Sequence, residues 1–285
     1  MKFTTKALAL CASVAAVIGA MPQRVEAQTM AACPATSSMT LAAFAADPTY
    51  QGSCAGTPTV YGLTFYEMGL CQTDPMSSGT FDPTSAGCVP TFQSSGGEYH
   101  DIAGATVTLG SDTGTERPAD GDYGVAYVVF SNVFTLKGSY GFAAGGGAAA
   151  TNWVSNGDPT SETASNADNG GTPQEFTDTL TTFGGGAGGG CDPDWAEPQA
   201  NGTLNAYIAT GSISSGLTTD TSCASATTIV GALALTSPIT ISSSTTGLQV
   251  DFSVTNNGLS VMGSIAGGDP GFGSGPFSAT FTVLE

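Results

Sequence analysis

The chain has 285 residues, of which 5 are Lys or Arg and 23 are Asp or Glu, so its formal net charge is −18. A surface this acidic repels phosphate groups, which excludes nucleic acid and anionic lipid as partners. Hydrophobic residues make up 40% of the chain and charged residues only 10%, so the chain contains enough apolar side chains to bury a core.

The first residues have the pattern of a secretory signal peptide. Lys2 and Lys6 precede an apolar stretch at 7–20, and the small side chain of Ala27 suits a cleavage site. The apolar stretch is shorter than the about 20 residues that a transmembrane helix needs, and no second run of that length follows. We therefore expect residues 1–27 to be removed, and the mature protein to have no transmembrane helix.

Six cysteines follow the predicted signal peptide, and an even number favours disulfides in an oxidising compartment. They are Cys33, Cys54, Cys71, Cys88, Cys191 and Cys223. Several pairings are open, but loop closure costs least between near neighbours. We therefore predict the pairs Cys33–Cys54, Cys71–Cys88 and Cys191–Cys223. A zinc site is the alternative, but it needs closely spaced ligands, and the sequence offers neither a CxxC pair nor a histidine besides His100.

A short apolar run follows the predicted cleavage site and suits a β-strand. Met39, Leu41 and Phe44 are its large side chains. Such a strand can add to the sheet edge of another copy, which is one route to self-assembly. The alternative is that the run pairs within its own domain, where Cys33 tethers it.

Residues 28–142 are expected to form an N-terminal β region, because β-branched and aromatic residues recur there with strand-like spacing. A strand is predicted at 58–70, ending at Cys71. Further strands are predicted at 105–109, 123–130 and 133–140. The last two are expected to form a hairpin through a tight reversal at Ser131 and Asn132.

Three short motifs punctuate the stretch 59–142: a strand that ends at Cys71, the sequence Asp-Ile-Ala at 101–103, and Gly-Asp-Tyr at 121–123. This combination resembles secreted, disulfide-containing β-sandwich proteins of unassigned function from aquatic bacteria. The resemblance covers about eighty residues. It implies export and a sandwich fold, and it brings no catalytic residues with it.

The composition changes at 143–203, which is rich in glycine and also contains Ser and Asp. The runs GGGAAA at 145–150 and GGGAGGG at 184–190 are typical of flexible chain. We interpret this range as a long insertion or linker. The second run precedes Cys191 and lacks the lysine of a phosphate-binding loop, so it is read as a spacer.

Strand patterns resume in a C-terminal β region at 204–285. Strands are predicted at 204–210, 227–235, 239–243, 248–254, 259–265 and 277–284, with a hairpin turn at Asn256-Asn257-Gly258. Short strands at this spacing predict an all-β fold of the β-sandwich or jelly-roll-like kind. The C-terminal region forms either one sandwich with residues 28–142 or a second domain.

The string Asp-Thr-Gly-Thr that begins at Asp112 occurs in aspartic proteases. That chemistry needs two facing carboxylates, and the sequence contains no second copy of the motif. A dimer would supply one, but a turn between strands is the simpler interpretation. His100 lies between Glu98 and Asp101, and every Ser-His-Asp scheme would run through it. A surface histidine is favoured over a catalytic base.

Acidic loops suggest calcium, which binds carboxylate and carbonyl oxygens. The candidates are Asp120 with Asp122, Asp192 with Asp194, and the stretch 162–168, although none has a complete calcium-loop motif. No other cofactor is expected. The leading hypothesis is a secreted structural or adhesive surface protein that associates with itself or with other surface proteins, with a filament subunit as one form. The alternatives are a calcium- or glycan-binding module and, more remotely, a hydrolase that uses Asp112.

Overall fold

The computed structural model describes residues 30–104, 117–144, 151–161, 163–183, 191–265 and 268–285. They form a short helix and many strands, so the predicted all-β class is confirmed. The elements are α1 (Leu41–Ala46), β1 (Ser53–Gly56), β2 (Val60–Cys71), β3 (Val89–Asp101), β4 (Gly121–Ser131), β5 (Val133–Lys137), β6 (Ser139–Phe142), β7 (Thr151–Ser155), β8 (Ala167–Asn169), β9 (Phe176–Thr179), β10 (Asp194–Gln199), β11 (Gly202–Ser212), β12 (Gly216–Thr219), β13 (Thr228–Ile241), β14 (Gly247–Ser253), β15 (Leu259–Met262), β16 (Gly271–Ser274) and β17 (Ser278–Leu284).

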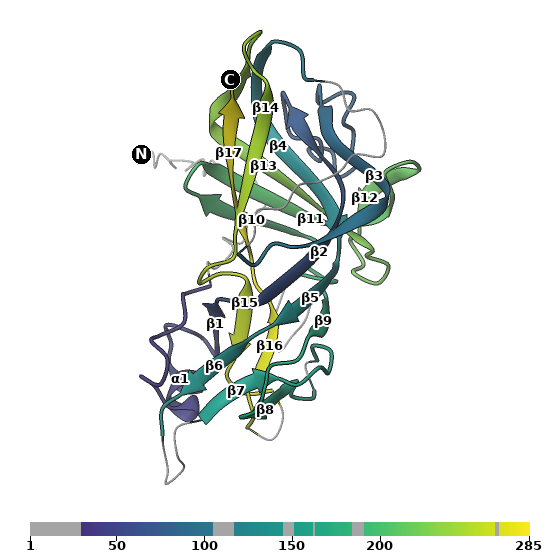
Figure 1. The fold of residues 1–285 in the computed structure, drawn as a ribbon. Helices are drawn as coiled ribbons and strands as arrows, with labels where there is room; N and C mark the ends of the chain where they lie inside the picture. The colour runs from purple at the N-terminus through teal and green to yellow at the C-terminus, as the bar shows by residue number, and fades with distance from the viewer. Residues whose placement is uncertain (1–29, 105–116, 145–150, 162, 184–190, 266–267) are drawn as a thin grey trace, which may run out of the picture.

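A nine-stranded antiparallel sheet organises the molecule (Figure 1). Its order is β10-β11-β13-β4-β2-β5-β9, with β12 paired to β11 and β3 paired to β2. The central strand β2 has β3 along one edge. Along its other edge, the beginning of β2 pairs with β5 and the rest pairs with β4. Gly69 pairs with Pro90 of β3 and Tyr127 of β4, whereas Gly62 pairs with Asp101 of β3 and Thr135 of β5.

The hairpin predicted at 123–140 is wrong. Both β4 and β5 run antiparallel to β2, so the chain continues in one direction through Ser131 and Asn132. A two-residue hairpin turn needs positive φ in its central residues, and neither of these two residues has it. The apolar residues on either side therefore extend one long line of backbone instead of folding back.

Asn132 lies between β4 and β5. At this point the strand that pairs with their outer edge changes from β13, beside β4, to β9, beside β5. Its backbone N–H donates to the carbonyl of Thr227, and its carbonyl accepts from the N–H of Leu180. The side-chain Nδ2 donates to the carbonyls of Leu180 at 3.0 Å and Ala226 at 3.1 Å, and only 3% of the residue is exposed. One buried amide thus joins the ends of two strand pairings.

Smaller sheets cover one side of the nine-stranded sheet. The pair β14–β17 packs Leu248, Phe281 and Val283 onto a cluster around Leu70 and Tyr123. Farther along, the sheets β1-β15-β16 and β6-β7-β8 contribute to the largest core cluster, which also contains side chains of β2 and β5 (Figure 1). The arrangement is a sandwich, as the strand spacing predicted, and β13 pairing with β4 places the N- and C-terminal β regions in one sheet.

The range 143–203 contains strands that sequence reasoning missed. Strands β7 and β8 pair with β6 and with each other, β9 pairs with β5, and β10 pairs with β11. The described part of this range is therefore structured, while the glycine runs 145–150 and 184–190 lie outside the described residues. The strand predicted at 105–109 also lies outside them.

The predicted assembly strand with Met39, Leu41 and Phe44 does not form: Leu41 and Phe44 lie in the helix α1, and Met39 precedes its cap. Thr40 caps α1 by accepting a hydrogen bond from the backbone N–H of Ala43, and the helix sequence LAAFAA is rich in alanine, the best helix former. Phe44 is fully buried against Tyr50 and Phe142. The segment therefore belongs to the core of its own molecule, so its large side chain is not available to a neighbour.

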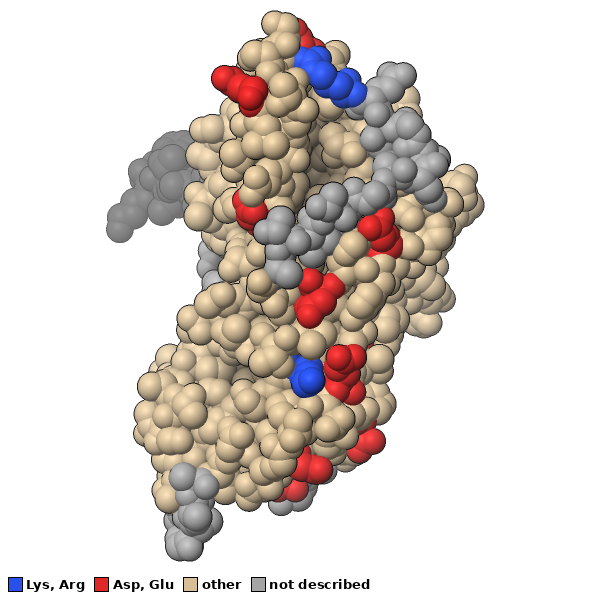
Figure 2. Space-filling model, viewed as in Figure 1, with Lys and Arg blue, Asp and Glu red and all other residues tan. Residues whose placement is uncertain are grey.

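The turn predicted at Asn256-Asn257-Gly258 forms, and Asn256 has the expected positive φ of 54°. It is not a hairpin, however, because β14 before it pairs with β17, whereas β15 after it pairs with β1 and β16. The turn carries the chain from one sheet to another. Over the surface in Figure 2, acidic side chains are scattered singly or in small groups, without one large patch.

Replacing Asn132 with Ala is expected to destabilise the protein by about 2–4 kcal/mol, because a buried amide is lost and two partly buried carbonyls lose their donor. Urea unfolding measures the loss. The matched control is Asn152→Ala on β7, which removes an exposed side chain and is expected to cost less than about 0.5 kcal/mol. Equal losses in the two variants would contradict the joining role of Asn132.

Candidate functional site

Three disulfides form, Cys33–Cys54, Cys71–Cys88 and Cys191–Cys223, which is the pairing that loop closure predicted. Disulfides of this number indicate an oxidising compartment, either extracellular or periplasmic. Over the residues that the structure describes, no helix has the length and apolar character required to cross a membrane.

The disulfide Cys71–Cys88 fixes a loop over part of one side of the nine-stranded sheet. It links the end of β2 to the residue before β3, so the loop 72–88 folds back onto the sheet. There Met76 and Phe81 are buried, and the ring of Phe81 lies 5.6 Å from that of Tyr127 on β4. The loop covers this part of the sheet, and it does not extend over the part formed by β5 and β9.

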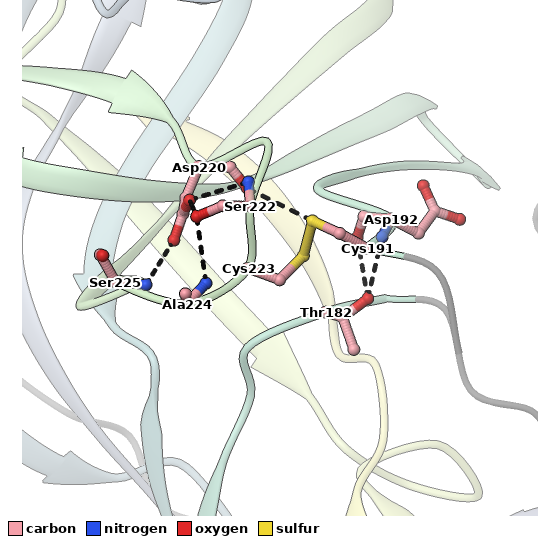
Figure 3. Close-up of a disulfide and its surroundings, with 8 residues drawn as sticks. All are labelled: Thr182, Cys191, Asp192, Asp220, Ser222, Cys223, Ala224 and Ser225. Carbon is pink, nitrogen blue, oxygen red and sulfur yellow. Dashed lines mark hydrogen bonds between the residues drawn. A yellow bond between two sulfur atoms is a disulfide. The ribbon is translucent and has the colours of Figure 1, made fainter. Parts of the chain in front are cut away.

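The disulfide Cys191–Cys223 anchors a hydrogen-bonded turn (Figure 3). The carboxylate of Asp220 accepts from the hydroxyl of Ser222 at 2.6 Å, from the N–H of Ser222 at 3.0 Å and from the N–H of Ser225 at 2.7 Å. These bonds, led by the Ser222 hydroxyl, lower the pKa of Asp220. Asp220 is thus committed to holding the turn rather than to binding a ligand.

A buried polar cluster joins three neighbouring strands. Glu67 on β2 is 4% exposed and accepts from Tyr127 Oη at 2.6 Å and from Gln93 Nε2 at 2.9 Å. Burial first, and then the Glu67 charge, raise the pKa of Tyr127 far above its usual value. A phenol in this state does not ionise near neutral pH, so Tyr127 acts as a hydrogen-bond donor to Glu67 and braces the strands.

Glu197 on β10 is a buried carboxyl whose hydrogen bonding is incomplete. It is 4% exposed, and its Oε2 has no hydrogen-bond partner. Burial raises its pKa from 4.5 to about 7. Strongly raised carboxyl pKa values occur at functional sites, but no catalytic partner of Glu197 is identified within the described residues, so it remains an isolated group.

The predicted calcium ligands do not gather. Asp120 pairs with Arg117 at 2.6 Å, and Asp122 accepts from the hydroxyl of Thr240 at 2.7 Å. Asp192 and Asp194 flank Pro193 beside the Cys191–Cys223 disulfide. In the described ranges no three His, Cys, Asp or Glu side chains form a metal-binding group. Glu162, within the third candidate stretch, lies outside those ranges.

The predicted catalytic candidates also remain separate. His100 lies on β3, where its Nε2 is 2.5 Å from Glu98 Oε1, so it forms a pair on one strand. Asp112 lies outside the described residues. Sequence reasoning thus found the histidine and its acidic neighbour, and within the described residues the structure places them side by side on one strand.

The remaining candidate is a sheet surface that no other described element covers, which we call the open face. It is the outward side of β3, β2, β5 and β9 and includes Tyr99, Thr64, Val133, Thr135 and Thr177. The buried strand neighbours Leu63, Phe134 and Phe176 show that alternation turns the other four outward, and Tyr99 pairs with Thr64 and so lies on the same side. Tyr99 is 52% exposed and Val133 41%, which places two large hydrophobic side chains in solvent. Sequence reasoning missed this surface, although the alternation of Thr with apolar residues was its signal.

Comparison with protein-family models, with curated proteins and with solved structures finds no match to this chain.

Replacing Glu197 with Gln is expected to stabilise the protein above pH 7 by about 1–3 kcal/mol. A carboxyl whose pKa rises on folding favours the native state while it is protonated, and that advantage disappears as the pH rises through about 7. The Gln side chain stays neutral, so the gain at pH 8 should shrink as the pH falls through about 7 and vanish at pH 4, below the ordinary value of 4.5. Thermal unfolding at both pH values, with exposed Glu175→Gln as the control, measures it; a gain independent of pH would refute the assignment.

Proposed function

We propose that the protein is exported and serves as a structural or adhesive component of a cell surface or its surroundings. The observation that carries this proposal is the set of three disulfides, which fix the N-terminal segment, the loop 72–88 and the turn at Cys223 to the sheets. A covalently fixed sandwich of this kind suits a protein that has to persist outside the cell. The signal-peptide pattern at 1–27 supports the same location.

The internal use of the polar groups also supports a structural role. Glu67 and Asp220 hold strands and turns, and Asp178 on β9 accepts from the N–H of Ser274 on β16 at 2.6 Å. Each of these carboxylates is buried and serves packing. The open face and the sheet edges are the surfaces that remain for contact with another molecule.

Self-assembly by strand addition is a second candidate, and the sheet β14–β17 favours it. Within the described residues these two strands pair only with each other, so each presents one edge of backbone groups. An unpaired edge is a template for a strand of another chain. This route replaces the one through Met39, Leu41 and Phe44, because that segment is helical and packed inside.

The location is tested on protein taken from its natural source. We expect mass spectrometry to find the six cysteines at 33, 54, 71, 88, 191 and 223 unreactive to alkylation until reduced, and an N-terminus at Gln28. The physical reason is that disulfides of secreted proteins persist only outside reducing compartments. Free thiols on a chain that still carries residues 1–27 would overturn the proposal.

Assembly is tested by light scattering and electron microscopy over a concentration series. If strand addition operates, the apparent mass should rise with concentration and fibres should appear. Changing Gln249 and Asp251 on β14 to Pro removes backbone donors from that strand and is expected to abolish the rise if β14 supplies the edge, whereas Thr280→Pro makes the same test on β17. Monomers at every concentration, with no fibres, would reject the filament form and leave adhesion standing.

A further inference from the structure

The open face is a different kind of surface from the rest of the same sheet side. Next to the open face, on the same side of the sheet, β4 turns Val129, Tyr127 and Val125 outward. These side chains are buried in a cluster with residues of the loop 72–88. On the open face itself, three strands each present a threonine: Thr64 and Thr135 are partly exposed, and Thr177 is exposed. Thr135 and Thr177 are cross-strand partners, so the carbons that bear their hydroxyls lie about 4.8–5.5 Å apart.

Tyr99 lies across this surface rather than projecting from it. A Cβ placed on Gly62 would be 2.1 Å from Tyr99 Oη and 2.6 Å from its Cζ, so the phenol end of the ring rests over that glycine. Gly62 occupies the interior of the twelve-residue strand β2, where glycine weakens a strand but allows close approach. Because 52% of Tyr99 remains exposed, the aromatic ring contributes a flat surface that faces solvent.

An exposed aromatic ring beside hydroxyl groups suits a ligand that has both apolar C–H faces and hydroxyls. Tyr supplies a large contact area at low conformational-entropy cost, since only two side-chain torsions are fixed. The threonine hydroxyls donate and accept hydrogen bonds to such a ligand. A carbohydrate ring presents both features, and a polysaccharide repeats them along its length, so that one chain can reach Tyr99 and the threonines of neighbouring strands together.

Charge selects among the possible occupants. A net charge of −18 repels anionic polymers and also a second copy of this chain. The charges bordering the open face include Lys137 on β5 and Asp101 on β3, and Asp101 Oδ1 already accepts from the N–H groups of Tyr61 and Ala103. The view in Figure 2 likewise shows acidic side chains dispersed among uncharged residues. A neutral chain approaches such a surface without electrostatic penalty.

We propose that the open face binds an extended neutral polysaccharide, which stacks on Tyr99 and lies across β3, β2, β5 and β9. This inference rests on the proposed adhesive function and names the ligand class for it. Val133, 41% exposed on β5, adds apolar contact on the other side of β2. Thr177 on the edge strand β9 marks the far end of the contact.

The test is retention of the purified protein on insoluble cellulose, chitin and curdlan, with alginate as the anionic comparison. We expect retention on at least one neutral polymer and none on alginate. Tyr99→Phe keeps the ring and should retain binding, whereas Tyr99→Thr should weaken it at least tenfold. Leu284→Thr is the matched control, because Leu284 is 42% exposed but lies on β17, and it should bind like the wild type.

A second variant guards against a folding defect, since Tyr99 also covers Gly62. Thr177→Glu alters an exposed side chain and should weaken binding while thermal unfolding stays unchanged. The inference is overturned if the wild type binds none of the three neutral polymers, or if both Tyr99→Thr and Thr177→Glu bind them normally. A concentration-dependent dimer that Tyr99→Thr abolishes without sugar would assign the face to a second copy instead.

The two proposals fail separately. If cells that lack the protein lose attachment but the purified protein binds no neutral polymer, adhesion stands and the polysaccharide inference falls. If the protein is found reduced and inside the cytosol, the surface function falls whatever the purified protein binds.

Discussion

The fold depends on the continuation of β4 into β5 beside β2. Because the chain does not reverse at Asn132, β2 is flanked on both edges over most of its length, and one core runs beneath it from Met68 to Tyr61. The cost of this continuity is a change of outer neighbour from β13 to β9, which would leave carbonyls unpaired. The buried Asn132 amide supplies their donors, so the sheet changes partner without losing backbone hydrogen bonds.

The scarcity of cations determines how the interior carboxylates are stabilised. Of the described basic side chains, Arg117 pairs with Asp120 at the surface, so buried acids rely on neutral donors. Glu67 uses a phenol and an amide, and Asp178 uses a backbone N–H. Hydrogen bonds to a charged acceptor are stronger than neutral ones, which makes this solution workable. Glu197 lacks a partner on one oxygen, and its raised pKa is the consequence.

Local patterns predicted the long strands and the cysteine pairs, because alternation and loop length are properties of neighbouring residues. Local patterns failed where contacts between residues far apart in the sequence determine the secondary structure. The short strands at 151–179 lie in polar, glycine-rich sequence, and contacts such as Asn166 with both backbone groups of Phe272 hold them in place. A six-residue apolar run does not distinguish helix from strand, and in α1 the alanines and the Thr40 cap decided. That Tyr99 lies over Gly62 depends on strand register, which requires knowing the partner strand.

The two halves of the outer sheet side show why Tyr99 stands apart. Where β4 turns Val129 and Tyr127 outward, burial is favourable, and the chain supplies a disulfide-fixed loop to achieve it. Where β5 and β9 turn Thr135 and Thr177 outward, the threonine hydroxyls form hydrogen bonds with water, so burial beneath a loop is not required for stability. The extra residue in β2 between Phe65 and Glu67 lies between the part of the sheet side that the loop covers and the part that carries the threonines. Tyr99 and Val133 are the exceptions in the second half, since they keep apolar surface in water although the loop 72–88 covers such surface in the first half. Contact with another molecule is the arrangement in which that exposure becomes favourable.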